Sequence, residues 1–249
     1  MTEPVAVTDE GAVRTIRINR PEKKNALTVA MYGAMTKALR EADLSDAIRC
    51  VMFAGAPGAF CAGNDIADFM QAAAGGRWET TAVDFLKALA SSRKPLVAAV
   101  DGVAIGIGTT MLFHCDHVVA GADAMLSTPF LKLGLIPEAA STLLAPQRLG
   151  HARAFSLLVM GRPLSAAEAK EAGLVNSVVE HALVDDVARK AAHDIAALPP
   201  RALAVARRLM RGHGDAIVNQ IEAETAHFGE LLKSDEARAA FQAFFARKK

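Results

Sequence analysis

Alternation of apolar and polar residues near the start of the chain predicts a β-hairpin. Two β-rich runs, Val5–Thr8 and Val13–Ile18, flank the short turn Asp9-Glu10-Gly11, and the second run alternates apolar with polar residues. From Thr28, a candidate N-cap, apolar residues then recur at helical spacing as far as Ala42. This spacing predicts an amphipathic helix with one face on the surface.

Continuous apolar runs farther along predict strands that are buried on both faces. The runs Ile48–Ala54, Leu96–Val100 and His117–Ala120 fit such strands, and Thr109–Cys115 fits a buried helix. Ser165-Ala166-Ala167-Glu168 has the capping-box pattern of a helix start. Beyond it, periodicity predicts helices over 184–198, 201–211 and 216–232. We therefore expect an α/β fold with an added layer of helices.

Composition narrows the class of protein. The 249 residues carry 28 Lys plus Arg against 27 Asp plus Glu, so a charge of +1 gives no reason to expect a nucleic-acid partner. An apolar fraction of 52% excludes disorder and favours one large core. The stretch Leu96–Phe113 contains Asp101 and three glycines, so we expect no membrane span. Because no cationic segment precedes an apolar run at the N-terminus, we expect a cytoplasmic protein.

Residue types that commonly bind metals are present without a convincing arrangement. Cys50, Cys61 and Cys115 form an odd set with no Cys-x-x-Cys pair, which favours buried free thiols over disulfides or a zinc site. The cluster from His114 to His117 occupies consecutive positions, whose side chains point in different directions. We therefore expect no metal.

Two glycine-rich loops each follow a predicted strand and open a predicted helix. The first spans Phe60–Ile66 and the second spans Gly102–Gly108, which lacks the third glycine of a dinucleotide fingerprint because Met111 stands there. Such loops can present backbone N–H groups to one oxygen atom, as an oxyanion hole requires. Alternatively, the glycines merely allow close packing of strand against helix, and the spacing leaves both interpretations open.

Glu138 is a lone carboxylate in an apolar neighbourhood. Since Pro137 precedes it, the residue pattern favours a routine helix opening in which the acid interacts with the helix dipole. The remaining histidines are scattered, and no Ser-His-Asp or Cys-His arrangement can be singled out.

Four ordered motifs make the chain similar to the enoyl-CoA hydratase/isomerase (crotonase) family. They are Ile18–Leu27, Ala59–Ile66, Lys94–Gly108 and Leu164–Ala169 with Gly173-Leu174-Val175. The resemblance implies a spiral of β-β-α units over residues 1–195 and a helical region, 196–249, that forms homotrimers or dimers of trimers. It also implies an acyl-CoA thioester as substrate and no metal or redox cofactor, coenzyme A being part of the substrate.

The resemblance assigns site residues by position. It matches the segment along the adenine and phosphates of CoA with Lys24, Ala26 and Leu27, and the loop along pantetheine and thioester with Ala62, Asn64, Asp65 and Ile66. The N–H groups of Asn64 and Ile107 match the two oxyanion-hole donors. Ile107 also opens a predicted helix, whose dipole would strengthen its donor role.

Departures from the hydratase pattern bear on the reaction. The two positions that hold glutamates in typical hydratases hold Thr110 and Phe130 here, and neither side chain can act as a general base. The stretch Ser127–Glu138 instead resembles peroxisomal-type Δ3,Δ2-enoyl-CoA isomerases, in which the position of Glu138 carries the single catalytic acid. A hydratase, other thioester-enolate chemistry and a non-catalytic acyl-CoA-binding protein remain alternatives.

Overall fold

The computed structural model describes residues 3–67, 70, 78–212 and 214–246. Ten strands in the described part form two sheets. The larger sheet has the order β1-β2-β3-β5-β7-β10. Its strands are β1 (Val5–Glu10), β2 (Val13–Ile18), β3 (Cys50–Gly55), β5 (Leu96–Val100), β7 (His117–Gly121) and β10 (Ser177–Val179). All its pairs are parallel except the β1–β2 hairpin, so the predicted hairpin is confirmed.

The smaller sheet, of order β4-β6-β8-β9, contains β4 (Ala59–Cys61), β6 (Val103–Ile105), β8 (Met125–Ser127) and β9 (Leu164–Ser165). Each of β3, β5 and β7 is followed at once by a strand of this second sheet. The chain therefore winds through repeated β-β-α units, as the resemblance implied.

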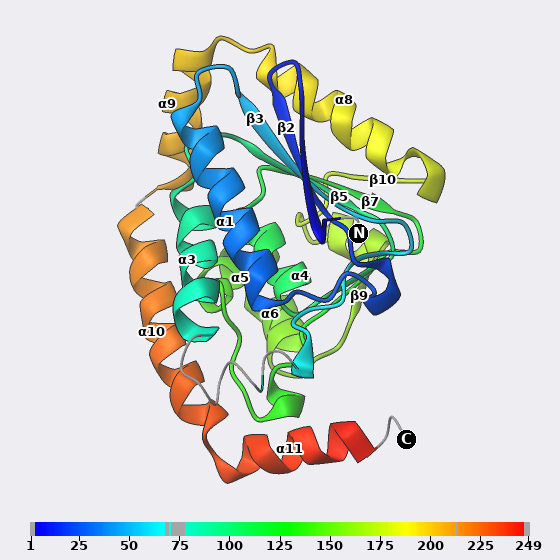
Figure 1. Ribbon diagram of the computed structural model, residues 1–249, viewed down its shortest axis with the longest axis vertical. Coiled ribbons are helices and arrows are strands. Elements are labelled where there is room, and N and C mark those ends of the chain that lie inside the picture. The colour runs from blue at the N-terminus through cyan, green and yellow to red at the C-terminus, as the bar shows by residue number, and fades with distance from the viewer. Residues whose placement is uncertain (1–2, 68–69, 71–77, 213, 247–249) are drawn as a thin grey trace.

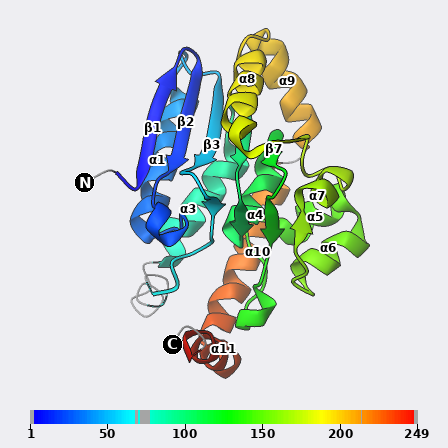
Figure 2. The same cartoon turned by 90° about the vertical axis from the view of Figure 1, so that its right-hand side faces the viewer.

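Helices cover both faces of the larger sheet (Figures 1 and 2). The helices that contribute to the main core are α1 (Val29–Leu44), α3 (Trp78–Ser91), α4 (Ile107–Thr110), α5 (Ser141–Leu149), α6 (His151–Leu158), α7 (Ala166–Glu171), α10 (Gly214–Leu232) and α11 (Asp235–Ala246). On the opposite face lies α8 (Val184–Ala196), which α9 (Pro200–Arg211) follows in the chain. Short 3-10 turns span Pro21–Lys23, Met111–His114, Leu131–Leu133 and His181–Leu183. The expected buried helix over Thr109–Cys115 is α4 joined to the second of these turns.

The alternation of side chains along β3 explains why its sequence is apolar throughout. Val51 and Phe53 enter the main core with α1 and α3, whereas Cys50, Met52 and Ala54 enter a second core beneath α8. A strand with helices on both faces buries every side chain, so a continuous apolar run results. β5 follows the same rule.

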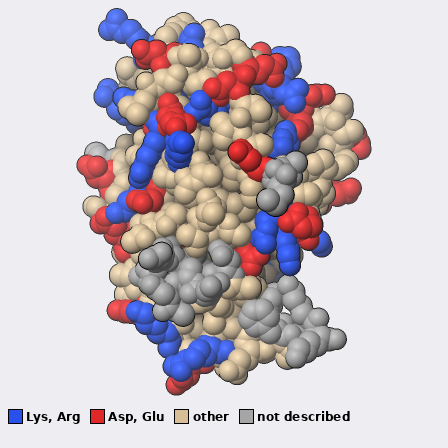
Figure 3. Space-filling model, viewed as in Figure 1, with Lys and Arg blue, Asp and Glu red and all other residues tan. Residues whose placement is uncertain are grey.

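Charged residues lie over the outside of this core. On the face drawn in Figure 3, Lys and Arg alternate with Asp and Glu. In the described part of the chain, no helix is long and apolar enough to span a bilayer. All three cysteines are buried free thiols, as expected.

Candidate active site

The two glycine-rich loops lie side by side because the strands that precede them are neighbours. β4 and β6 are parallel, with Ala59 opposite Val103 and Cys61 opposite Ala104. The carboxyl ends of neighbouring parallel strands meet at one edge of a sheet, which places the following loops together. A Cβ atom on Gly108 would lie 2.6 Å from the carbonyl oxygen of Cys61. The glycines therefore allow close packing, and the two loops that contain them lie together, whereas the oxyanion-hole interpretation stays a prediction.

The backbone around Asn64 forms a bridge to Leu27 that does not use the N–H of Asn64 itself. A parallel bridge joins Leu27 to Asn64, in which Leu27 donates to the oxygen of Gly63 at 2.8 Å and accepts from Asp65 at 2.8 Å. That pattern uses the groups on either side of Asn64 and directs its own N–H away from Leu27. The side-chain oxygen of Asn64 accepts a hydrogen bond from the hydroxyl of Tyr32 at 2.6 Å.

Ile107 supplies a comparable N–H from the second loop. It is the first residue of α4, and the N–H groups of a first helical turn have no partner within the helix. Gly106 precedes it with φ of 57°, a backbone conformation that favours glycine. Because α4 is a single turn, its dipole is smaller than the sequence led us to expect, and the donor role rests on the N–H itself.

Asn64 and Ile107 line one cavity of about 480 Å³. Its walls are mostly apolar, and the C-terminal helices contribute Phe228 of α10 and Phe241 of α11. Ala62 and Ile66 also line it, as expected for residues along a bound thioester. A concave apolar site whose lining includes two candidate backbone donors is suited to a thioester carbonyl.

Other expected substrate contacts lie beside this cavity rather than on its wall. Lys24 is exposed, and its carbonyl accepts from the N–H of Ala62 at 3.0 Å. Arg20 donates to the carboxylate of Asp65 at 2.7 Å and to the carbonyl of Ala26 at 3.2 Å. The structure thus brings the Lys24–Leu27 segment against the first loop, and Asp65 is held in an ion pair.

Glu138 is buried, with 5% of its surface exposed, and its Oε1 has no hydrogen-bond partner in the described part of the chain. Burial, followed by repulsion from Glu224, raises its pKa to about 8. It is not among the residues that line this cavity. Burial, followed by the charge of Glu138, raises the pKa of Tyr32, and burial above all raises the pKa of Cys61. Tyr32 in turn donates its hydroxyl hydrogen to the side-chain oxygen of Asn64.

The expected helix opening at Pro137-Glu138 is wrong. Residues 135–138 belong to no helix or strand, Ala139 and Ala140 have φ of 64° and 53°, and α5 begins only at Ser141. The helix start lies three residues later because a side chain from α10 caps it, as described below. Glu138 is therefore outside the helix and does not play the routine dipole role.

Thr110 and Phe130 show what replaces the hydratase acids. Thr110 is fully buried, and its hydroxyl oxygen has no partner among the described residues. Phe130 is on the cavity wall and its ring lies 3.9 Å from where a Cβ of Gly106 would be. Neither residue brings an ionisable group to the cavity.

Sequence reasoning missed Tyr32, Glu224 and the two cavity phenylalanines. Tyr32 fits the apolar face of the predicted helix. Its hydroxyl was the only feature of the sequence that indicated a polar contact. Glu224 lies in a predicted helix and is 3% exposed. A charged residue on the apolar face of that helix was the feature of the sequence that could have indicated its role.

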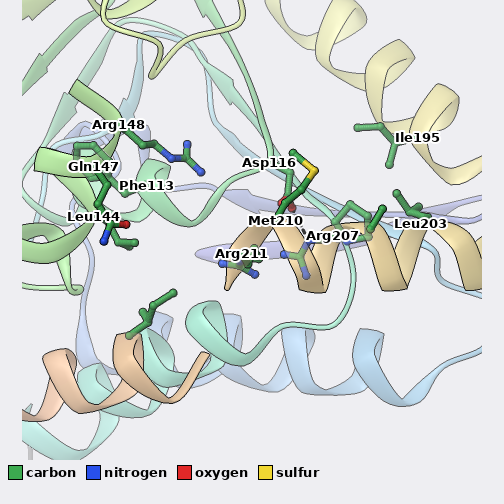
Figure 4. A pocket seen from close by; sticks show the side chains of 13 residues that line it. Phe113, Asp116, Leu144, Gln147, Arg148, Ile195, Leu203, Arg207, Met210 and Arg211 are labelled. Carbon is green, nitrogen blue, oxygen red and sulfur yellow. Dashed lines mark hydrogen bonds and ion pairs between the residues drawn. The ribbon is translucent and has the colours of Figure 1, made fainter. Parts of the chain in front are cut away.

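A second cavity, of about 450 Å³, lies between α5, α8, α9 and α10 (Figure 4). Arg207 donates to Asp116 at 2.8 Å and to the carbonyl of Ser92 at 2.6 Å, and Arg211 donates to the carbonyl of His114 at 3.2 Å. These bonds satisfy carbonyls at the ends of α3 and of the turn Met111–His114. The arginines thus attach α9 to the core. Within the described residues, no three His, Cys, Asp or Glu side chains are grouped as metal ligands.

Comparisons with known proteins show which family the chain resembles. A family model described as enoyl-CoA hydratase/isomerase matches residues 8–249. The chain is 34% identical to enoyl-CoA delta isomerase 2 of Rattus norvegicus over 98% of its length, and it spans 64% of that relative. It is 31% identical to 1,2-epoxyphenylacetyl-CoA isomerase of Escherichia coli (strain K12), with 96% of this chain and 94% of the relative covered.

A relative named for another reaction is almost as similar. The chain is 30% identical to a probable enoyl-CoA hydratase of Rhizobium meliloti (strain 1021), with 99% of this chain and 96% of the relative covered. Among solved structures, OdaA of Pseudomonas aeruginosa superposes with a TM-score of 0.93 at 41% identity, with 98% and 99% of the two chains covered.

Proposed function

The chain belongs to the enoyl-CoA hydratase/isomerase family, and from this premise we propose that it isomerises a 3-enoyl-CoA to the 2-trans-enoyl-CoA with Glu138 as its single acid–base group. The observation that carries the proposal is the state of Glu138: a buried carboxyl with an unpartnered oxygen and a pKa of about 8. Such a group both takes and returns a proton near neutral pH.

The proposed reaction moves one proton and one double bond. Ionised Glu138 takes a proton from C2 of the 3-enoyl thioester, and the electron pair moves onto the thioester oxygen to form a dienolate. The N–H groups of Asn64 and Ile107 stabilise that oxygen because they are fixed in place before the charge develops. The carboxyl then returns the proton at C4, the double bond shifts to C2–C3, and Glu138 is ionised again.

Two features support isomerisation over hydration. Hydration needs groups that activate and deliver water, whereas Thr110 and Phe130 have no side chain that ionises near neutral pH. Isomerisation needs one carboxyl. Since Glu138 is not among the residues that line the cavity, the proposal requires that the bound acyl chain reach its carboxyl.

The proposal also covers substrate binding and assembly. CoA would lie along Lys24, Ala26 and Leu27, with the thioester along Ala62 and Ile66, and no metal or redox group takes part. We further propose a homotrimer, or a dimer of trimers, in the cytoplasm. Support for assembly comes from α9, on which Leu209 is 73% exposed and Met210 is 88% exposed.

The test is Glu138→Gln, assayed with 3-hexenoyl-CoA for isomerisation and with crotonyl-CoA for hydration. We expect isomerisation to fall by about 10²–10⁴, since that is the usual contribution of a general base. CoA-ester affinity should stay within about threefold because the amide keeps the size of the carboxyl. Glu41→Gln, at an exposed position of α1, is the control.

Unchanged isomerisation by the Glu138 variant would refute the assignment. Faster hydration than isomerisation by the wild type would favour a hydratase. Binding of CoA esters without turnover of either compound would indicate a non-catalytic acyl-CoA-binding protein.

A further inference from the structure

A second buried carboxylate lies close to Glu138. Glu224 comes from the middle of α10 and is 3% exposed. Burying a charged group costs free energy unless hydrogen bonds compensate it, so a buried glutamate requires an explanation.

Both oxygens of Glu224 accept hydrogen bonds from the start of α5. Oε2 accepts from the N–H of Ala140 at 2.7 Å, and Oε1 accepts from the N–H of Thr142 at 3.0 Å and from its hydroxyl at 2.5 Å. The residue at the N-cap position, Ala140, has no side chain that can cap the helix. Glu224 therefore supplies from a distant helix the acceptor that a local Ser, Asp or Asn usually provides.

The same contacts hold the backbone turn that follows Glu138. Ala139 and Ala140 both have left-handed φ values, which are unfavourable for a residue with a Cβ. Besides the bond from Ala140 to Glu224, two contacts fix the turn: His114 Nε2 bonds the carbonyl of Ala139 at 2.8 Å, and the N–H of Ser141 donates to the carbonyl of Glu138 at 3.1 Å. The strained turn and the cap together set where the Glu138 side chain starts.

The negative charge of Glu224 also affects the pKa of Glu138. The three donors favour the ionised form of Glu224, although burial raises its pKa to about 7. Its negative charge then adds to burial in raising the pKa of Glu138. The other titratable groups near Glu138 are Tyr32 of α1 and Cys61 of β4, whose pKa values burial raises, so both are neutral. Burial lowers the pKa of His114 to about 3, so it is neutral too.

We propose that Glu224 is a positioning residue for proton transfer by Glu138: it clamps the left-handed turn that carries Glu138 and keeps that carboxyl beside a fixed negative charge. This inference rests on the proposed function. It assigns to the C-terminal helical region a part in the chemistry, through Glu138 and without contact with substrate.

The experiment compares Glu224→Gln with the wild type over a range of pH. The amide keeps the length of the side chain and one acceptor oxygen, but it removes the charge. We expect the acidic limb of kcat/KM, near pH 8 in the wild type, to move to lower pH by about one unit, and the plateau to fall as the turn loosens. Glu222→Gln is the matched control, because Glu222 lies on the same helix and pairs with Lys87 at the surface.

A second readout does not depend on turnover. Infrared titration of the protonated carboxyl of Glu138, assigned by the loss of its band in Glu138→Gln, should show the same downward movement in Glu224→Gln. Thr142→Val should move it in the same direction by less, since loss of the hydroxyl donor raises the pKa of Glu224 and so reduces its charge.

Two results would overturn the inference: a Glu138 titration unchanged in both variants, or a lower plateau with an unmoved acidic limb, which is what a purely structural cap would give. Should Glu138→Gln keep full isomerase activity while Glu224→Gln still moves the carboxyl band, the proposed reaction fails and the coupling of the two residues stands.

Discussion

At the scale of single residues, burial has opposite effects on acids and bases of this site. Removing water disfavours the charged form of each group, so the pKa of Glu138 rises to about 8 while that of His114 falls to about 3. At neutral pH the histidine is a neutral hydrogen-bonding group that holds the carbonyl of Ala139. The glutamate can therefore exchange a proton in the working range, and the histidine cannot.

The raised pKa of Glu138 predicts how stability depends on pH. The folded state keeps a proton on Glu138 up to about pH 8, whereas an unfolded glutamate loses it near pH 4.5. Since the folded state binds more protons between these values, the free energy of unfolding should decrease as pH rises from about 4.5 to about 8. The Glu138→Gln variant lacks this contribution, so its free energy of unfolding should rise relative to that of the wild type between pH 4.5 and pH 8. Urea unfolding of both proteins at pH 5 and pH 8 measures these free energies. An equal change between the two pH values in both proteins would contradict the prediction.

At the scale of elements, the local sequence predicts where a helix begins when neighbouring residues cap that helix. Thr28 caps α1 by accepting from the N–H of Met31, and Ser165 with Glu168 forms the capping box of α7, both as predicted. The start of α5 differs because its acceptor, Glu224, is 84 residues away from Ala140 in the chain. No window of sequence around Pro137 contains that information.

The packing of α4 against β4 gives a prediction at this scale. Gly108→Ala would place a Cβ 2.6 Å from the carbonyl oxygen of Cys61, so the two loops must separate. We expect a loss of about 1–3 kcal/mol in stability and a strong loss of activity, because the donors at Asn64 and Ile107 would no longer converge. Chemical denaturation and the 3-hexenoyl-CoA assay measure the two effects.

Gly33→Ala is its control within a helix. Gly33 lies in α1, where the nearest atom to an added Cβ is 3.9 Å away, so alanine should stabilise the protein by about 0.5–1 kcal/mol. Equal effects of the two substitutions would show that close approach at Gly108 is not what matters.

At the scale of the whole molecule, the C-terminal helices return to the site made by the first part of the chain (Figure 1). Phe228 and Phe241 line the cavity, and Glu224 reaches the turn after Glu138. Assembly through residues 196–249 stays a prediction. The structure adds that residues of this region line the cavity together with residues of 1–195.

The exposed apolar face of α9 predicts what disrupts assembly. Leu209→Asp places a charge where we expect a second copy to pack, and burial of an unpaired charge is costly. The wild type should have the mass of a trimer or hexamer by light scattering, and the variant that of a monomer. Leu44→Asp, at an 81% exposed leucine of α1, should keep the wild-type mass. A monomeric wild type, or a variant that still assembles, would exclude this face.

The fold was predictable from sequence to the extent that periodicity and motifs report it. The buried strands, the hairpin and the helices after residue 184 follow from apolar spacing, and the four motifs imply the β-β-α spiral. The sequence does not show which side chains from distant parts of the chain come into contact in the folded protein. Tyr32 with Asn64, and Glu224 with Ala140, are pairs of distant residues whose contact depends on the finished packing.

The burial of all three thiols makes the chain unusually easy to label. Cys50, Cys61 and Cys115 are 0% exposed, and burial raises their pKa values to about 12, so the reactive thiolate is scarce. Maleimide reagents should therefore leave the folded protein untouched. A cysteine introduced at the 88% exposed Met210 would then accept a single fluorophore in an otherwise native background, and its emission would report directly on the meeting of subunits.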